Sequence, residues 1–167
     1  METYITLASA TPFQTINPFW NAVEKEWIKP EQCRIFYVKE HSKELQEIMK
    51  WMQEVYLQYN KKSSVNFHAH VFHDENITAF VQAIKDVIRM EVESGNKVVM
   101  DITSASWNYI PAAFMLIADE NRDIVKSILY HQVSQPSYLE MPYPLIPYTE
   151  QRLYNLLQIE ALEEVAL

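Results

Sequence analysis

Short segments rich in β-branched and aromatic residues alternate with helical patterns along most of the chain, and this alternation constrains the fold more than any other feature. The strand-like segments cover residues 3–8, 33–38, 65–72, 97–102 and 125–131. Between them, apolar residues recur three and four positions apart, which is the spacing of a helix with one buried face. Such alternation predicts a mostly parallel sheet with helices on both faces. We therefore expect a Rossmann-like, doubly wound α/β fold with five to six strands.

Asparagine, proline and glycine mark the expected helix ends. Asn17 followed by Pro18 indicates a helix start. Asp74 or Asn76 can cap the helix that Gly95 ends.

The length of 167 residues suits one domain with a short extension. We expect residues 1–135 to form the Rossmann-like domain. Residues 136–167 are expected to form a proline-rich connector and a C-terminal helix over 149–164.

The sequence contains a single glycine, Gly95. The phosphate-binding loops of P-loop NTPases and of dinucleotide-dependent dehydrogenases need several glycines, because their backbone must approach a phosphate closely. Both classes are therefore excluded as motif matches, and we expect no cofactor. The single cysteine, Cys33, excludes a disulfide framework within the chain and a zinc ribbon. Its place at the start of an apolar segment predicts a buried structural thiol.

Acidic residues outnumber basic ones by 22 to 14, which gives a formal net charge of -8. This charge disfavours contact with phosphate backbones, so direct nucleic-acid binding by this chain is not expected. A small anionic ligand held by backbone groups stays possible. The N-terminus lacks the pattern of a signal peptide, and no apolar run reaches the roughly 18 residues of a membrane span. We expect a cytoplasmic protein without membrane contact.

In doubly wound sheets, ligands bind beyond the carboxyl ends of the strands, where the strand order reverses. We expect the fourth strand to lie beside the first, which brings two loops of small and hydroxyl-bearing residues together. The candidate ligand-binding residues of these loops are Ser9, Ala10, Thr11, Thr103, Ser104, Ala105 and Ser106. Their hydroxyls and N–H groups can donate to phosphate oxygens, and a helix over 108–119 adds the positive end of its dipole near Asn108. Alternatively, the second loop merely caps that helix.

Three histidines, His68, His70 and His73, lie on or just after the third strand-like segment. Imidazole is a common metal ligand, but this spacing does not bring three ligands to one point. We therefore interpret them as half-buried strand residues and expect no metal site.

The segment from Val98 to Trp107 resembles the signature of CARF domains, the CRISPR-associated Rossmann-fold sensors. In that family the fourth strand ends in Asp or Asn, then a hydrophobic residue and Thr, followed by small and hydroxyl-bearing residues. Asp101, Ile102 and Thr103 match this pattern. The resemblance covers about residues 1–135.

The resemblance implies a homodimer that binds cyclic oligoadenylate, the second messenger of type III CRISPR antiviral defence, across its two-fold axis. The ligand would contact residues 9–11 after the first strand and 103–106 after the fourth. A ring with rotational symmetry suits such a dimer, because each protomer presents the same patch.

The second loop departs from the family's pattern. Ser104 and Ala105 replace the usual pair that contains glycine, and Trp107 stands where a basic residue is common. Some family members are ring nucleases that rely on this cation, so its replacement implies ligand sensing without fast cleavage. The Trp107 ring could instead stack on an adenine. A ring nuclease and a ligand-free dimerisation module are the alternatives.

The residues that follow the prolines resemble the opening of a winged-helix module, which follows such sensor domains in transcription regulators. The chain would then be the sensor part of a longer regulator. Alternatively, the expected helix over 149–164 is a dimerisation element.

Overall fold

Six strands form one sheet: β1 (Glu2–Leu7), β2 (Gln32–Val38), β3 (Asn66–Phe72), β4 (Lys97–Asp101), β5 (Val125–Val133) and β6 (Gln151–Asn155). Their order is β3-β2-β1-β4-β5-β6. All neighbouring pairs are parallel except β5 and β6, which are antiparallel. This computed structural model describes residues 1–60, 64–72, 77–104 and 109–158. The expected Rossmann-like α/β fold is confirmed, and the fourth strand lies beside the first as expected.

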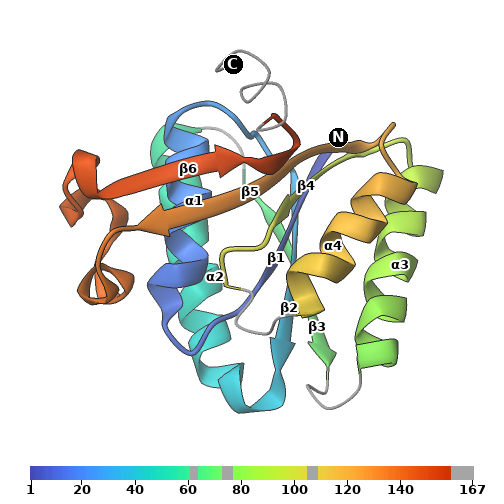
Figure 1. The fold of residues 1–167 in the computed structure, drawn as a ribbon, viewed down its shortest axis with the longest axis horizontal. Helices are drawn as coiled ribbons and strands as arrows, with labels where there is room; N and C mark the ends of the chain where they lie inside the picture. The colour runs from blue at the N-terminus through green and yellow to red at the C-terminus, as the bar shows by residue number, and fades with distance from the viewer. Residues whose placement is uncertain (61–63, 73–76, 105–108, 159–167) are drawn as a thin grey trace, which may run out of the picture.

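Helices α1 (Pro12–Glu24) and α2 (Ser42–Tyr59) cover one face of the sheet, and α3 (Ile77–Glu93) and α4 (Tyr109–Glu120) cover the other (Figure 1). Each face has its own apolar core. Phe19 and Met52 belong to the core under α1 and α2, and Phe80 and Phe114 to the core under α3 and α4. Cys33 is a fully buried thiol in the first of these cores, as predicted. Among the described helices, none is long and apolar enough to span a membrane.

Short 3₁₀ turns complete the described chain: η1 (Lys39–His41), η2 (Pro136–Glu140), η3 (Tyr143–Leu145), η4 (Tyr148–Glu150) and η5 (Leu156–Gln158). Gly95 follows α3 with a φ of 66°, the left-handed conformation that favours glycine at the end of a helix.

Helix α1 begins at Pro12, so the predicted start at Asn17 is wrong. Thr11 followed by Pro12 carries the same capping pattern earlier in the chain, and the helix continues through Pro18. Asn17 is buried and bonds the backbone of a distant segment instead, at residues 141–143. As a result, the first turn of α1 directly follows the loop after β1.

The helix expected over 149–164 is wrong for the residues that the structure describes there. Residues Gln151–Asn155 form β6, which pairs with β5. Gln151 and Leu153 are buried while Arg152 between them is exposed, and this alternation is that of a strand with one covered face. The segment therefore adds an antiparallel edge strand to the sheet.

A buried ionic cluster joins β1, β2 and α3. Nε of Arg34 donates to Oε1 of Glu91 at 2.7 Å, and the hydroxyl of Thr3 and the amide of Asn96 each donate to Oε2 at 2.7 Å. Burial raises the pKa of Glu91, but the hydrogen bonds from Asn96, Thr3 and Arg34 and the charge of Arg34 outweigh it and hold the pKa below its usual value. Arg34 therefore has a structural partner.

We expect Glu91→Ala to lower the free energy of unfolding by about 3–5 kcal/mol, because it leaves the Arg34 charge buried and unpaired. Glu91→Gln keeps an acceptor and should cost less. Urea denaturation measures both, and the exposed neighbour Glu93→Ala is the matched control, with an expected change within about 0.5 kcal/mol. Equal losses for Glu91→Ala and Glu93→Ala would contradict this role of the cluster.

Candidate functional site

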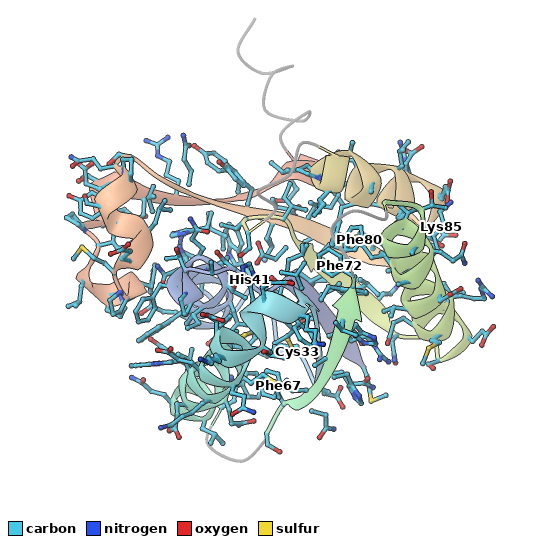
Figure 2. All side chains as sticks on the ribbon, turned by 90° about the horizontal axis from the view of Figure 1, so that it is seen from below. Cys33, His41, Phe67, Phe72, Phe80 and Lys85 are labelled. Carbon is cyan, nitrogen blue, oxygen red and sulfur yellow. The ribbon has the colours of Figure 1, made fainter. Side chains whose placement is uncertain are left out.

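A cleft of about 240 Å³ lies at the carboxyl edge of the sheet. The strand order reverses here, between β1 and β4, and we call this space the switch-point cleft. The loop after β1, the start of α1, η1 and the loop after β4 contribute part of its lining: Ser9, Ala10, Thr11, Gln14, His41 and Ser104. Val38 and Phe72, at the ends of β2 and β3, add apolar wall. Figure 2 labels two of the lining residues, His41 and Phe72.

Hydrogen bonds fix the loop after β1 onto the first turn of α1. The N–H of Thr11 donates to Oγ of Ser9 at 3.1 Å, and the Ser9 hydroxyl donates to Oε1 of Gln14 at 2.7 Å. The N–H of Ser9 donates to Oγ1 of Thr15 at 3.1 Å. The loop therefore holds its conformation without a ligand.

The carboxyl group of Asp101 lies fully buried at the end of β4. Thr6 on β1 donates its hydroxyl to Oδ2 at 2.8 Å. Thr103 donates its N–H and its hydroxyl to Oδ1, at 2.9 and 2.6 Å. The Thr103 oxygen also accepts the N–H of His131 on β5 at 2.9 Å. Burial raises the pKa of Asp101 to about 6, although the hydrogen bonds from Thr103 and Thr6 act in the opposite direction.

Thr15 joins both loops to α1. Its hydroxyl donates to the carbonyl of Leu7 at 2.9 Å, so its oxygen accepts the hydroxyl of Ser104 at 3.0 Å. The hydroxyls of Ser104 and Thr103 were expected to donate to a ligand. In the structure Ser104 bonds Thr15 and Thr103 bonds Asp101, and these hydrogen bonds hold the second loop in place.

Backbone N–H groups are the donors that remain at the cleft. Within the described residues, the N–H groups of Ala10 and Ser104 have no hydrogen-bond partner. The first turn of α1 carries no acidic side chain and no side-chain cap, so the positive end of its dipole is not neutralised. Nδ1 of His41 is buried and also lacks a partner in this part of the chain. These groups suit an anion of modest size.

A second hollow, of about 400 Å³, lies at the carboxyl end of β5, and we call it the β5 hollow. Its lining includes Gln14, Thr103, Tyr130, His131, Ser134 and Gln135. Gln14 also lines the switch-point cleft, so the two spaces are neighbours.

His131 in this hollow is held as a neutral ring. Burial lowers its pKa, and Nε2 lies 2.9 Å from Oε1 of Gln151. The Gln151 amide donates to the carbonyls of Tyr143 and Ile146, at 3.1 and 2.8 Å. Its oxygen must therefore accept, which places the His131 proton on Nε2.

The structure places the described candidate residues of the two loops in adjoining spaces. Ser9, Ala10, Thr11 and Ser104 line the switch-point cleft, and Thr103 lines the β5 hollow. The remaining candidates lie outside the described residues: Ala105, Ser106, Trp107 and Asn108.

Sequence reasoning missed Gln14, His41 and Tyr130. Gln14 was missed because the start of α1 was placed at Asn17, although Thr11 followed by Pro12 carried the needed signal. His41 ends η1, the short turn after β2, at the carboxyl edge where a ligand was expected. No local signal identified Tyr130, because its surroundings depend on η2 and β6.

The histidines of β3 have separate surroundings. His68 is exposed, whereas the half-buried His70 stacks on Phe36 with ring centroids 5.0 Å apart. Burial, Arg34 and His68 lower the pKa of His70. Among the described residues no group of three His, Cys, Asp or Glu could hold a metal ion, and His73 lies outside them.

We expect the buried carboxyl group of Asp101 to give stability a distinct pH dependence. Its pKa of about 6 lies above the unfolded value of 3.8, so the folded state holds the proton longer. The free energy of unfolding should therefore fall as pH rises from about 4 to about 6, by up to about 3 kcal/mol. Asp101→Asn should remove this component, and chemical denaturation across this pH range measures it.

The exposed Asp123→Asn serves as control and should keep the wild-type pH profile. A profile for Asp101→Asn that parallels the wild type through pH 4–6 would count against a protonated Asp101 in the fold.

No protein-family model matches the chain, and no curated protein does. Among solved structures, the chain is similar to Csm6 of Enterococcus italicus, solved bound to cyclic hexa-2'-fluoro-hexa-dAMP, with a TM-score of 0.59 and 12% identity. The match covers 97% of this chain and 44% of the Csm6 chain, so the chain spans less than half of that protein's length. At this identity the similarity establishes the fold. The chain therefore shares its Rossmann-like α/β fold with the matched part of Csm6.

Proposed function

We propose that this protein is a sensor of cyclic oligoadenylate in type III CRISPR defence, and that it binds the ring in the switch-point cleft. One observation carries the proposal: residues with unpartnered N–H groups and the start of a helix line a cleft at the reversal point of a fold that the chain shares with Csm6. The Csm6 structure holds a cyclic adenylate analogue.

The donor set matches a phosphodiester. Each phosphodiester carries one negative charge and two free oxygens, which accept hydrogen bonds from N–H groups. The N–H groups of Ala10 and Ser104 and the start of α1 provide such donors without a lysine or arginine in the described lining. The unpartnered nitrogen of His41 adds a further contact. Residues 105–108, with Trp107, would complete the second loop.

We assign no catalytic residue. Cleavage of a ring of this kind develops charge on a phosphate, and a positioned cation normally stabilises it. The described lining of the cleft contains no lysine or arginine. Many turnovers of a cyclic oligoadenylate to linear products would show the protein to be a ring nuclease instead.

We expect cyclic tri-, tetra- or hexa-adenylate to raise the melting temperature of the protein, because a ligand that binds only the folded state stabilises it. AMP and linear oligoadenylates should have little effect. Calorimetry with the effective ring should show about tenfold weaker binding for His41→Ala, as expected for the loss of one hydrogen bond to a charged group.

The exposed His68→Ala removes an imidazole from β3 instead and should bind like the wild type. If none of the three rings raises the melting temperature of the wild type, the proposed function is refuted, and the chain is a structural module instead.

We also propose a homodimer, and the outer face of α4 is where we expect the second copy. Phe114 and Ile117 of this helix are buried, yet Met115 and Leu116 on the other side are 42% and 66% exposed. A helix that is apolar all round is normally covered on every side. Asp119 and Arg122, which form an ion pair with each other, flank this apolar surface.

Leu116→Glu should convert the dimer to a monomer, because it buries a charge in an apolar contact. Light scattering coupled to size exclusion measures the mass without ligand, so this test is independent of the ligand screen. Leu145→Glu is the matched control, since Leu145 is 64% exposed on η3. A monomeric wild type, or a dimer that survives Leu116→Glu, would speak against this interface.

A further inference from the structure

We propose that β3 is a pairing edge, at which two copies of this chain join their sheets by antiparallel pairing of β3 with itself, centred on Ala69. This contact is a second interface between copies, separate from the outer face of α4. The inference goes beyond the proposed function and does not depend on the ligand.

The outer side of β3 is open and carries none of the usual protection. β3 is the last strand at its end of the sheet, and its neighbour is β2. Figure 1 shows it in green with α2 and α3 on its two sides. Its sequence, Asn66–Phe72, contains no Lys, Arg, Asp, Glu or Pro. Natural proteins place such residues on open edges to prevent pairing with another chain, and β6 at the other edge carries the exposed Arg152.

The backbone of β3 presents a self-complementary row of hydrogen-bonding groups. The N–H of Asn66 donates to the carbonyl of Glu31 at 3.0 Å, on the side of β2. The direction of these groups alternates along a strand, so those of Phe67, Ala69 and Val71 face the open side, where no described strand pairs with them. Antiparallel pairing about Ala69 brings the three N–H groups of each copy to carbonyls of the other. Such a contact has the two-fold symmetry of most homodimers.

The apolar side chains of β3 match in the same register. The half-buried Phe67 of one copy lies directly opposite Val71 of the other, and Val71 is 55% exposed in the single chain. An aromatic residue opposite a β-branched one is a favourable cross-strand pair. The two-fold axis forms this pair twice, and each time it covers an apolar side chain that is otherwise in water.

A buried nitrogen at this edge also lacks a partner. Nε2 of His70 is buried and has no hydrogen-bond partner in the described part of the chain. Stacking of the His70 ring on Phe36, with centroids 5.0 Å apart, fixes its orientation. In the paired strands the exposed imidazole of His68 from the second copy lies directly opposite His70 and can bond it. The second copy thus satisfies a buried polar atom, whereas an unrelated peptide would offer its backbone alone.

This contact is compatible with a dimer through α4. Helix α4 contacts β5, and β2, β1 and β4 lie between β5 and β3, so the two contacts do not compete for the same surface. A single pair of strands buries less surface than a stable interface needs. We therefore expect β3 to pair at higher protein concentrations than those at which the α4 contact forms, where it joins dimers end to end.

Ala69→Cys tests the register directly. Residues opposite each other in a hydrogen-bonded antiparallel pair have Cα atoms about 5.5 Å apart, which a disulfide can span. Cys33, the single native cysteine, is buried and does not interfere. With oxidised glutathione as oxidant, Ala69→Cys should form covalent dimers about tenfold faster than Val71→Cys, because pairing raises the effective concentration of its thiol. Val71→Cys is the matched control on the same edge, since position 71 meets Phe67 in this register.

A second comparison separates pairing from the reactivity of the thiol. Val71→Lys, added to Ala69→Cys, places a charge against Phe67 of the second copy and should slow dimer formation about tenfold. Val92→Lys is its matched control on α3, where Val92 is 44% exposed, and should leave the rate unchanged. Circular dichroism checks that each variant is folded.

Equal rates for Ala69→Cys and Val71→Cys, or a rate that Val71→Lys does not lower, would overturn the pairing edge. Neither result involves the ligand, so the proposed function would stand.

Discussion

The hydrogen bonds around the carboxyl group of Asp101 hold the carboxyl edge of the sheet together. Thr6 on β1 and Thr103 after β4 both donate to this group, and Thr103 also accepts from the backbone of β5 through His131. Three adjacent strands thus end in fixed relation to one another. A carboxyl group is suited to this role because it accepts several hydrogen bonds at once. The cost is a buried acid, which is why its pKa is raised.

Because the hydroxyls at this edge are bonded to the protein, recognition falls to other groups. The hydroxyls of Thr15, Ser104 and Thr103 form hydrogen bonds within the protein, and these bonds hold the loops in place. For the proposed ligand, the contacts are then left to the backbone N–H groups, the start of α1 and the side chains of His41 and Gln14. Hydrogen bonds already hold the backbone of these loops, so little of its conformational entropy would be lost when a ligand binds.

The sequence was sufficient for the architecture and insufficient for the site. The alternating pattern predicted the parallel sheet, and Asp101-Ile102-Thr103 pointed to the carboxyl edge, where the switch-point cleft lies. The start of α1 was misplaced because two Pro-containing signals compete, at Pro12 and Pro18, and tertiary bonds of Asn17 decide between them. The segment of β6 was taken for a helix because a run of five residues is too short to distinguish the period of a strand from that of a helix. The β5 hollow could not be predicted from the sequence, since η2, β5 and the loop after β4 form it together.

The scarcity of glycine affects how closely the backbone of the switch-point cleft can approach a ligand. Glycine-rich phosphate loops rely on positive φ angles, yet among the described residues only Glu26 and Gly95 have them, and neither lines the cleft. Ala8 and Ala10 give the loop after β1 small side chains in ordinary conformations. A backbone of this kind approaches a ligand less closely than glycine allows.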